Sequence, residues 1–209
     1  MTHGLRSELA ADARLYCALR WPARARPPWR ALIWLRSSGL LVLASQRVRY
    51  RYLQRRAQYG WSVGTFLTRL LIALTRRSIM VVTKTDVDDS IDIAPGVYLS
   101  DLGFLILGPV RIGSGTLIHE RVTIGVRAGD PGKPVIGANV WIGPDCVIYG
   151  NLSVGDGATV LPGAVVSMSV PARAVAAGNP ATIVRREFDN RVLRGGLARD
   201  IDPQSLAPR

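Results

Sequence analysis

The sequence predicts a mainly β protein, a solenoid of short strands preceded by an α-helical N-terminal region. Three observations predict it. An Ile or Val recurs at every sixth residue between Ile112 and Val166, with one gap at Asp130. Glycine often follows this aliphatic residue, and small or β-branched residues recur four positions after it. The arginines concentrate in the first 80 residues, which marks that region as a separate unit.

Residues 1–80 are expected to form a basic helical region. They hold 15 Arg and 2 acidic residues, a net charge of +13, whereas residues 81–209 hold 12 basic and 13 acidic residues, a net charge of −1. Apolar residues alternate with arginine at helical spacing, which predicts helices over 8–20, about 29–57 and about 62–79.

Three interpretations of this basic region stay open. The helices could pack on the solenoid with arginine facing solvent, or form a cationic amphipathic surface on anionic lipid. In the lipid interpretation the indoles near the headgroups are Trp21, Trp29, Trp34 and Trp61. The third, nucleic-acid binding, rests on arginine content alone, because no recognised nucleic-acid module is present, and we expect no nucleic-acid partner.

Residues 81–184 carry the repeat, which a strand or linker over 81–92 introduces. A six-residue period fits neither a helix nor a flat strand, so each hexad is one short strand and one turn wound around an axis. The aliphatic positions are Ile112, Ile118, Ile124, Ile136, Ile142, Ile148, Val154, Val160 and Val166. Ile93 and Leu99 keep the same step, Leu105 would follow, and one residue out of phase is predicted around Gly108-Pro109.

Two segments depart from the repeat. Residues 125–135 contain three Gly and two Pro, which predicts a loop leaving the solenoid. After Val170 the chain exits through PARAVAAGNPATIV, and residues 185–209 are expected to form a short helix (Arg185–Leu193) and a tail.

The remaining bulk features point to a cytoplasmic protein. Cys17 and Cys146 give no disulfide framework, and Cys146 occupies an inward position where packing is expected. No secretory signal is evident, and the longest apolar runs, Ser38–Ser45 and Leu70–Thr75, are too short to span a bilayer. A location peripheral to the inner face of the membrane stays open as an alternative.

The stretch IDIAPGVYLSDLGFLILG…IGSGTLIHERVTIG…GKPVIGANVWIGPDCVIYGNLSVGDGATVLPGAVV…AAGNPATIV resembles the hexapeptide-repeat acyltransferases. Within them it is most similar to the serine acetyltransferases and their relatives in capsule and exopolysaccharide clusters. The resemblance covers about residues 85–186 and includes the AGNPA ending. It implies a left-handed parallel β-helix, an exception to the usual right-handed crossover. It also implies a homotrimer with acetyl-CoA between neighbouring coils, and a loop at about Val126–Lys133 that reaches the adjacent subunit. Whether trimers pair through the N-terminal helices stays open.

The resemblance also implies direct acetyl transfer, in which a base takes the proton of an acceptor hydroxyl and the alkoxide attacks the thioester. The positions of the two histidines that serve this centre in the serine enzymes fall on Asp101 and Lys133. Our candidate catalytic residues are therefore His119, Asp101 and Glu120. For His119 a general base and a solvent-facing corner residue are both open interpretations, and Glu120 could instead be a surface carboxylate paired with Arg121 or Arg111.

Candidate cofactor-binding residues follow from the same resemblance. Gly143 would let pantetheine approach the backbone, and Lys133 could pair with a CoA phosphate. The terminal motif of the family corresponds to Gly178, Asn179, Pro180 and Ala181. Turn geometry alone would also explain the glycines. No metal site is expected.

These features predict an acetyl-CoA-dependent O-acetyltransferase acting on a small hydroxyl acceptor, L-serine or a related compound. One alternative is an O-acetyltransferase for a capsule or exopolysaccharide sugar precursor near the membrane. An alternative of another class is a catalytically inactive trimeric scaffold or regulator.

Overall fold

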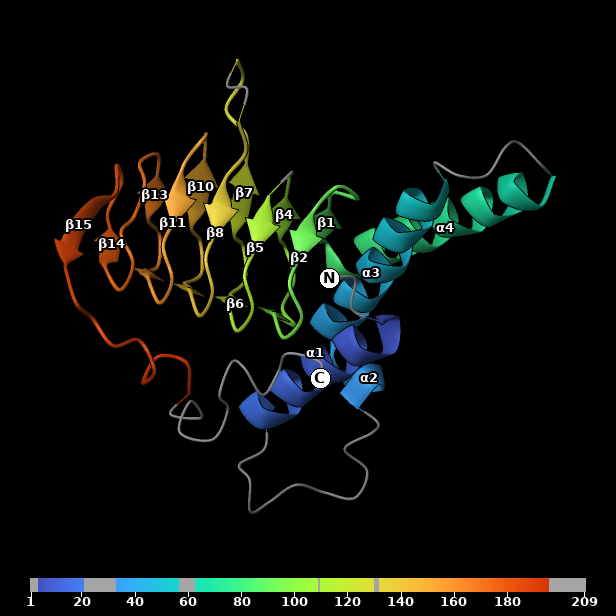
Figure 1. The fold of residues 1–209 in the computed structure, drawn as a ribbon, viewed down its shortest axis with the longest axis horizontal. Helices are drawn as coiled ribbons and strands as arrows, with labels where there is room; N and C mark the ends of the chain where they lie inside the picture. The colour runs from blue at the N-terminus through green and yellow to red at the C-terminus, as the bar shows by residue number, and fades with distance from the viewer. Residues whose placement is uncertain (1–3, 21–32, 57–62, 109, 130–131, 196–209) are drawn as a thin grey trace.

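The computed structural model describes residues 4–20, 33–56, 63–108, 110–129 and 132–195 (Figure 1). Helices form the N-terminal part: α1 (Leu5–Arg20), α2 (Ile33–Arg36), α3 (Ser38–Arg56) and α4 (Val63–Thr83). Strands of two to four residues form the rest, and Figure 1 shows them as a column with the helices gathered at the end that holds β1 and β2.

The helices follow the predicted ranges with three differences, and residues 29–32 and 57 of the second predicted helix lie outside the described residues. Helix α1 begins at Leu5, three residues before its predicted start. The helix expected over 29–57 is divided at Ser37 into α2 and α3. A distant residue caps the start of α3, because the Ser38 hydroxyl donates to the Asp101 carbonyl oxygen at 2.6 Å and Gly39 N–H donates to Asp101 Oδ1 at 3.1 Å. Helix α4 continues four residues beyond the predicted end at 79.

The strands run through three sheets in turn. They are β1 (Asp86–Val87), β2 (Asp92–Ile93), β3 (Tyr98–Leu99), β4 (Ile106–Leu107), β5 (Arg111–Ile112), β6 (Leu117–Ile118), β7 (Thr123–Gly125), β8 (Val135–Ile136), β9 (Trp141–Ile142), β10 (Val147–Tyr149), β11 (Ser153–Val154), β12 (Thr159–Val160), β13 (Val165–Val166), β14 (Val175–Ala177) and β15 (Thr182–Arg185). One sheet has the order β1-β4-β7-β10-β13, the second β11-β8-β5-β2, and the third β15-β14-β12-β9-β6-β3. Pairing is parallel throughout except between β14 and β15. The prediction of a mainly β fold with coiled short strands is therefore confirmed at the level of parallel sheets.

The aliphatic residue of each hexad forms the core between the sheets. All nine predicted positions from Ile112 to Val166 are at most 1% exposed. Cys146 is buried in the same core, as predicted from its inward position, and it forms no disulfide with Cys17. Because short strands supply few contacts each, this continuous aliphatic column is the main apolar stabilisation of the coil.

The repeat changes phase at two places, one upstream of the predicted Gly108-Pro109 and one in the step from Leu107 to Ile112 that contains this pair. Eight residues separate Leu99 from the next aliphatic position, which is Leu107 and not Leu105 as predicted, and five then separate Leu107 from Ile112. Gly103 and Phe104 both have positive φ, 72° and 59°, so the longer turn is made there. Leu105 is buried two positions before the strand aliphatic instead. Of the predicted pair, Pro109 lies outside the described residues.

Buried polar side chains of the helices satisfy the open edge of the first coil turn. The Tyr16 hydroxyl donates to Leu99 O at 2.6 Å and accepts from Leu99 N–H at 2.9 Å. Arg47 donates to the carbonyl oxygens of Ile93 and Ala94, both at 2.9 Å. Edge groups without a strand partner invite pairing with another chain, so these helices act as a cap.

The expectation that the arginines of this region face solvent is wrong for two of them. The Arg47 side chain is 3% exposed and the Arg49 side chain is 6% exposed. Arg47 forms a bidentate ion pair with the fully buried Asp12, at 2.7 and 3.0 Å, and Arg49 pairs with Asp89 at 2.6 Å. Buried guanidinium groups are retained here because carboxylates and strand carbonyls satisfy their N–H groups.

The helix predicted over Arg185–Leu193 is not formed. After β15 the chain makes bends and turns and runs back along the coil (Figure 1). Phe188 N–H donates to Arg173 O at 2.7 Å, and Asn190 Nδ2 donates to Asn139 O and Ala158 O at 2.9 and 3.2 Å. These bonds to the coil replace the bonds within a helix. The tail beyond residue 195 lies outside the described residues.

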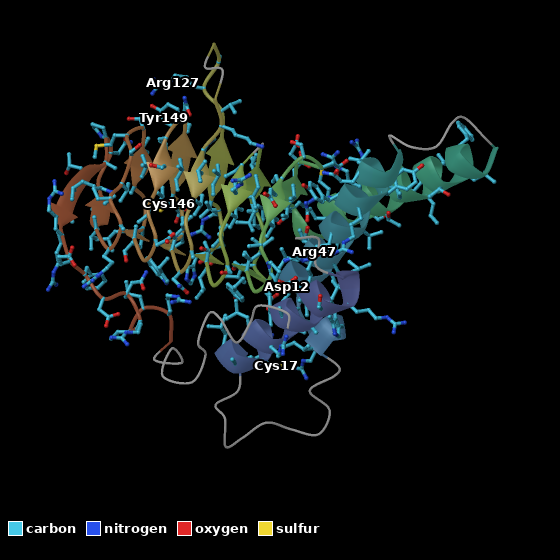
Figure 2. All side chains as sticks on the ribbon, viewed as in Figure 1. Asp12, Cys17, Arg47, Arg127, Cys146 and Tyr149 are labelled. Atoms are coloured by element: carbon cyan, nitrogen blue, oxygen red, sulfur yellow. The ribbon has the colours of Figure 1, made fainter. Side chains whose placement is uncertain are left out.

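The predicted loop projects from the coil between β7 and β8 (Figure 1). Arg127 lies over the Tyr149 ring, with its guanidinium carbon 5.0 Å from the ring centroid (Figure 2). Among the described helices, we find none with the length and apolar character needed to cross a bilayer.

Candidate functional site

One corner of the coil carries the candidate catalytic residues. Leu99, Ile118, Ile142 and Val160 pair in register across β3, β6, β9 and β12. Equal register places the residues that follow these positions on the same corner, where the chain leaves the six-stranded sheet for the five-stranded one. The corner residues of the four successive turns are Ser100 and Asp101, His119 and Glu120, Gly143 and Pro144, and Leu161 and Pro162.

His119 lies among aromatic rings on this corner. Its ring centroid is 4.9 Å from that of Trp141 and 6.4 Å from that of Tyr98. His119 Nε2 is buried and has no hydrogen-bond partner within the described structure. Burial lowers the pKa of the imidazole below its ordinary value, and the Glu120 carboxylate opposes this shift. The side chain is therefore a neutral imidazole near pH 7 whose Nε2 is not committed to a partner within the described structure.

Asp101 is engaged with the helices rather than with His119. Its carboxylate accepts from Gly39 N–H and pairs with Arg20 at 3.4 Å. Burial raises the pKa of the Asp101 carboxyl, while the Gly39 hydrogen bond and the Arg20 charge oppose the rise. A carboxylate held in this way orients charge at the site and is poorly placed as a base.

Glu120 lies one coil turn from Asp101 in the same corner position. Its Oε2 accepts a hydrogen bond from the Ser100 hydroxyl at 3.2 Å. The expected partner Arg121 instead forms a bidentate pair with Asp145 at 2.6 and 2.7 Å, and Arg111 pairs with Asp92. The Glu120 charge therefore remains available to the neighbouring imidazole.

A small pocket of about 140 Å³ opens where α1 and the start of α3 meet β3. It is lined by Tyr16, Leu19, Arg20, Ser37, Tyr98 and Asp101. The pocket presents a guanidinium group and a carboxylate, together with the buried Ser37 hydroxyl, which lies close enough to Asp101 to help lower the pKa of that carboxyl. Tyr98 lines the pocket on one side and lies near His119 on the other. The arrangement suits a small polar ligand that carries both charges.

Gly143 is required by packing as well as by any ligand. A Cβ at this position would lie 2.9 Å from Trp141 Cζ3 and 2.9 Å from Pro162 N, closer than real Cβ atoms approach such neighbours. The glycine therefore lets the Trp141 ring lie against the corner, beside His119. This close packing accounts for Gly143 as a structural residue of the corner.

The terminal motif lies at the last turn of the coil. Gly178 has a φ of +97°, the Asn179–Pro180 peptide bond is cis, and Gly178, Asn179 and Pro180 are exposed. Ala181 is buried, and its N–H donates to Val165 O at 2.9 Å. Gly178 accepts from Val165 N–H at 2.9 Å, so the motif is anchored to β13.

Lys133 is exposed and belongs to the projecting loop. The loop leaves the coil between the five-stranded and four-stranded sheets, which is a different corner from the one that carries His119. The structure therefore brings Asp101, His119, Glu120 and Gly143 to one corner, and it places Lys133 elsewhere in the protomer. Within the described residues no group of His, Cys, Asp and Glu has the arrangement of a metal site.

Sequence reasoning missed the aromatic and helical contributions to this site. Tyr98 and Trp141 both occupy the strand position before the buried aliphatic, and the pairing of β3, β6 and β9 brings them to one face. The hexad register could have found them. Tyr16 and Arg20 could not be found in this way, because their place depends on how α1 packs on the coil.

Comparison with known proteins gives one family match and a consistent set of relatives. The family model described as bacterial transferase hexapeptide (six repeats) matches residues 133–167. Serine acetyltransferase 2 of Arabidopsis thaliana is 34% identical over 153 residues, which is 71% of this chain and 46% of that protein. The chain spans about half the length of the first relatives that it matches.

Solved structures of similar fold include serine acetyltransferases with bound ligands. Soybean serine acetyltransferase in complex with serine is 31% identical, with a TM-score of 0.70 over 86% of this chain and 69% of that one. A serine acetyltransferase in complex with CoA is 26% identical, with a TM-score of 0.69 over 86% of this chain and 70% of that one.

Proposed function

The chain belongs to the hexapeptide transferases, in their serine acetyltransferase-like branch, and from that premise we propose that it transfers the acetyl group of acetyl-CoA to the hydroxyl of L-serine. The observation that carries the proposal is the arrangement of three groups at the corner. Tyr98 lines the oppositely charged pocket on one side and lies near His119 on the other. The His119 Nε2 has no hydrogen-bond partner in the described structure. The relatives solved with serine and with CoA support the two substrates.

The pocket has the chemistry to hold a zwitterionic amino acid. Arg20 would bind its carboxylate and Asp101 its ammonium group, in place of the 3.4 Å contact that these two side chains make with each other. The Ser37 hydroxyl would supply a further hydrogen bond. This binding fixes the direction of the acceptor hydroxyl, which is the main contribution of positioning to such a transfer.

His119 is the general base in this proposal. Its Nε2 takes the proton as the serine oxygen attacks the thioester carbonyl carbon. The C–S bond then breaks, and the sulfur leaves as CoA thiolate and takes the proton from the imidazolium. Burial keeps the imidazole neutral before reaction, and Glu120 stabilises the imidazolium that forms. General-base catalysis of this kind contributes about 10²–10⁴-fold in rate.

We extend the proposal to the assembly and the cofactor region. The coil is left-handed, three copies associate side by side, and acetyl-CoA lies between neighbouring coils. Gly143 and the exposed motif Gly178–Pro180, with Ala181 anchoring it, would line that groove. Lys133 lies on another corner of its own protomer, so it would reach a CoA phosphate at the neighbouring subunit. A cytoplasmic location fits these soluble substrates.

The test is the release of CoA thiol from acetyl-CoA with purified full-length protein. We expect turnover with L-serine and little with glucose. The His119→Gln variant should lower kcat by at least about 100-fold, and the matched control His3→Gln, the only other histidine in the chain, should retain full activity. Arg20→Gln should raise KM for serine, whereas Arg14→Gln, an exposed arginine on the same helix, should not.

The outcomes separate the alternatives. Turnover with a sugar and none with serine would refute the acceptor and favour the polysaccharide interpretation. Absence of both turnover and acetyl-CoA binding in calorimetry would leave a structural trimer as the function. Full activity in His119→Gln would place the base elsewhere.

A further inference from the structure

Helix α4 exposes a broad, largely apolar face. Seven of its apolar residues are at least 48% exposed, which is unusual for residues of this size on one helix. They are Phe66 (52%), Leu67 (58%), Leu70 (48%), Leu71 (63%), Leu74 (57%), Val81 (54%) and Val82 (80%). At 3.6 residues per turn these positions fall within a single arc of about 160°. Figure 1 shows the first turns of α4 projecting past α3 and away from the strands.

The opposite side of α4 is the one that packs on the protein. Its partly buried residues are Ile72, Arg76, Ile79, Met80 and Thr83. Arg76 lies there because it pairs with Asp86 at 2.8 Å and with Asp89 at 3.4 Å. The helix therefore directs its more apolar side outward, and packing within the protomer does not account for that side.

The charge around this face selects its partner. Helix α4 contains Arg69, Arg76 and Arg77 and no acidic residue. The only two acidic residues of the first 80, Glu8 and Asp12, are already paired with arginines of α3. Arg77 is exposed and falls within the apolar arc, between the directions of Phe66 and Leu70. A second α4 would bring another Arg77 and no carboxylate, whereas an anionic lipid surface offers both hydrocarbon and phosphate.

We propose that α4 is a membrane-surface helix that lies in the interface of an anionic phospholipid bilayer. The exposed Phe, Leu and Val side chains enter the boundary between headgroups and acyl chains, and Arg77 contacts lipid phosphates. Binding is peripheral, because none of the described helices is suited to span the bilayer. The proposal is independent of the acetyl-transfer chemistry, since α4 contributes no residue to the pocket.

The test is co-sedimentation of the full-length protein with vesicles of phosphatidylcholine alone and of phosphatidylcholine mixed with phosphatidylserine. We expect binding to the mixed vesicles that weakens with salt. The variant Leu67→Ser/Leu71→Ser should lower the partition coefficient at least about tenfold, because burial of apolar side chains drives interfacial binding. Arg77→Glu should weaken binding to the mixed vesicles only. The control Val184→Ser/Val192→Ser removes two exposed apolar residues, 58% and 80% exposed, outside the helices and should bind as the wild type does.

A second measurement covers the competing occupant and the fold of the variants. Sedimentation velocity without lipid should give the same oligomeric mass for wild type and Leu67→Ser/Leu71→Ser, and circular dichroism should give the same helix content. A lower mass for the variant would assign the face to a second copy of the chain. A wild type that does not bind phosphatidylserine vesicles, or a variant that binds them equally well, would overturn the proposal.

Discussion

The buried ion pair between Asp12 and Arg47 offers a sharp test of how the helices cap the coil. Asp12 is fully buried, and its carboxylate accepts from Arg47 Nε and Nη2 at 2.7 and 3.0 Å and from Gly96 N–H at 2.8 Å. Asp12→Ala would leave the Arg47 guanidinium buried with two N–H groups unpaired and the Gly96 N–H without its acceptor. Among the described contacts of Arg47, the Glu8 carboxylate, 3.4 Å from Arg47 Nη1, is the only other carboxylate that could replace Asp12.

The magnitude follows from removing one partner of a buried pair. Such removal typically costs about 3–5 kcal/mol, because the remaining charge is buried without compensation. Since the whole free energy of unfolding of a domain is about 5–15 kcal/mol, Asp12→Ala should remove a large part of it. The loss should be smaller in Asp12→Ala/Arg47→Met, because the double substitution removes the uncompensated charge as well.

The measurement is urea unfolding followed by circular dichroism, on the wild type, both variants and a matched control. The control is Asp86→Ala, which breaks the ion pair with Arg76 between side chains 47% and 39% exposed and should cost at most about 1 kcal/mol. If Asp12→Ala destabilises the protein no more than Asp86→Ala does, the cap is not held by this pair. If the double variant is less stable than Asp12→Ala alone, the buried charge is not the source of the cost.

Three further predictions concern single groups. Burial lowers the pKa of His119, and a general base must be unprotonated to act. The value of kcat/KM for serine should therefore stay constant as the pH falls to 6.5 and decline only below pH 6.5. A midpoint above pH 6.5 would contradict the assignment of His119 as the base. Gly39→Ala should lower the free energy of unfolding by about 1–3 kcal/mol, because an added Cβ would collide with the Leu99 carbonyl oxygen. The control is Gly163→Ala, where a Cβ would meet open space. It should show only the smaller cost of placing alanine at a positive φ. Burial raises the pKa of the Cys146 thiol to about 11, so peptide mapping after iodoacetamide treatment at pH 8 should find Cys146 modified in urea and protected in the native protein.

The sequence was sufficient to predict the coil, because its period repeats one physical requirement many times. Each aliphatic position must be buried between three sheets, and the nine positions found by counting are all in the core. The sequence was insufficient at Leu105. A longer turn at Gly103 and Phe104 moves the strand by two residues, and the amino-acid composition of this segment does not reveal the shift. The C-terminal segment was mispredicted as helical for a related reason, since Asn190 and Phe188 bond to the coil, and local spacing does not encode those partners.

The candidate site was predictable to the extent that it follows the register of the repeat. Asp101, His119, Glu120 and Gly143 share one corner because their strands pair in register, and each was chosen from the sequence. The division of roles among them depends on α1 and α3, which the repeat does not encode. Asp101 is held by Gly39 and Arg20, so tertiary packing disfavours it as the base, and our proposal gives that role to His119.

The same packing explains why the helical cap and the site belong together. The first turn of a coil has an open edge whose N–H and C=O groups need partners, and α1 supplies them through Tyr16 at Leu99. Satisfying that edge also places Tyr16 and Arg20 beside Tyr98, so a structural requirement of the coil end creates the walls of the pocket. His119 itself is half-buried beside two rings that the coil supplies, Tyr98 and Trp141. Its burial lowers the pKa of the imidazole, which is the condition that a neutral base requires.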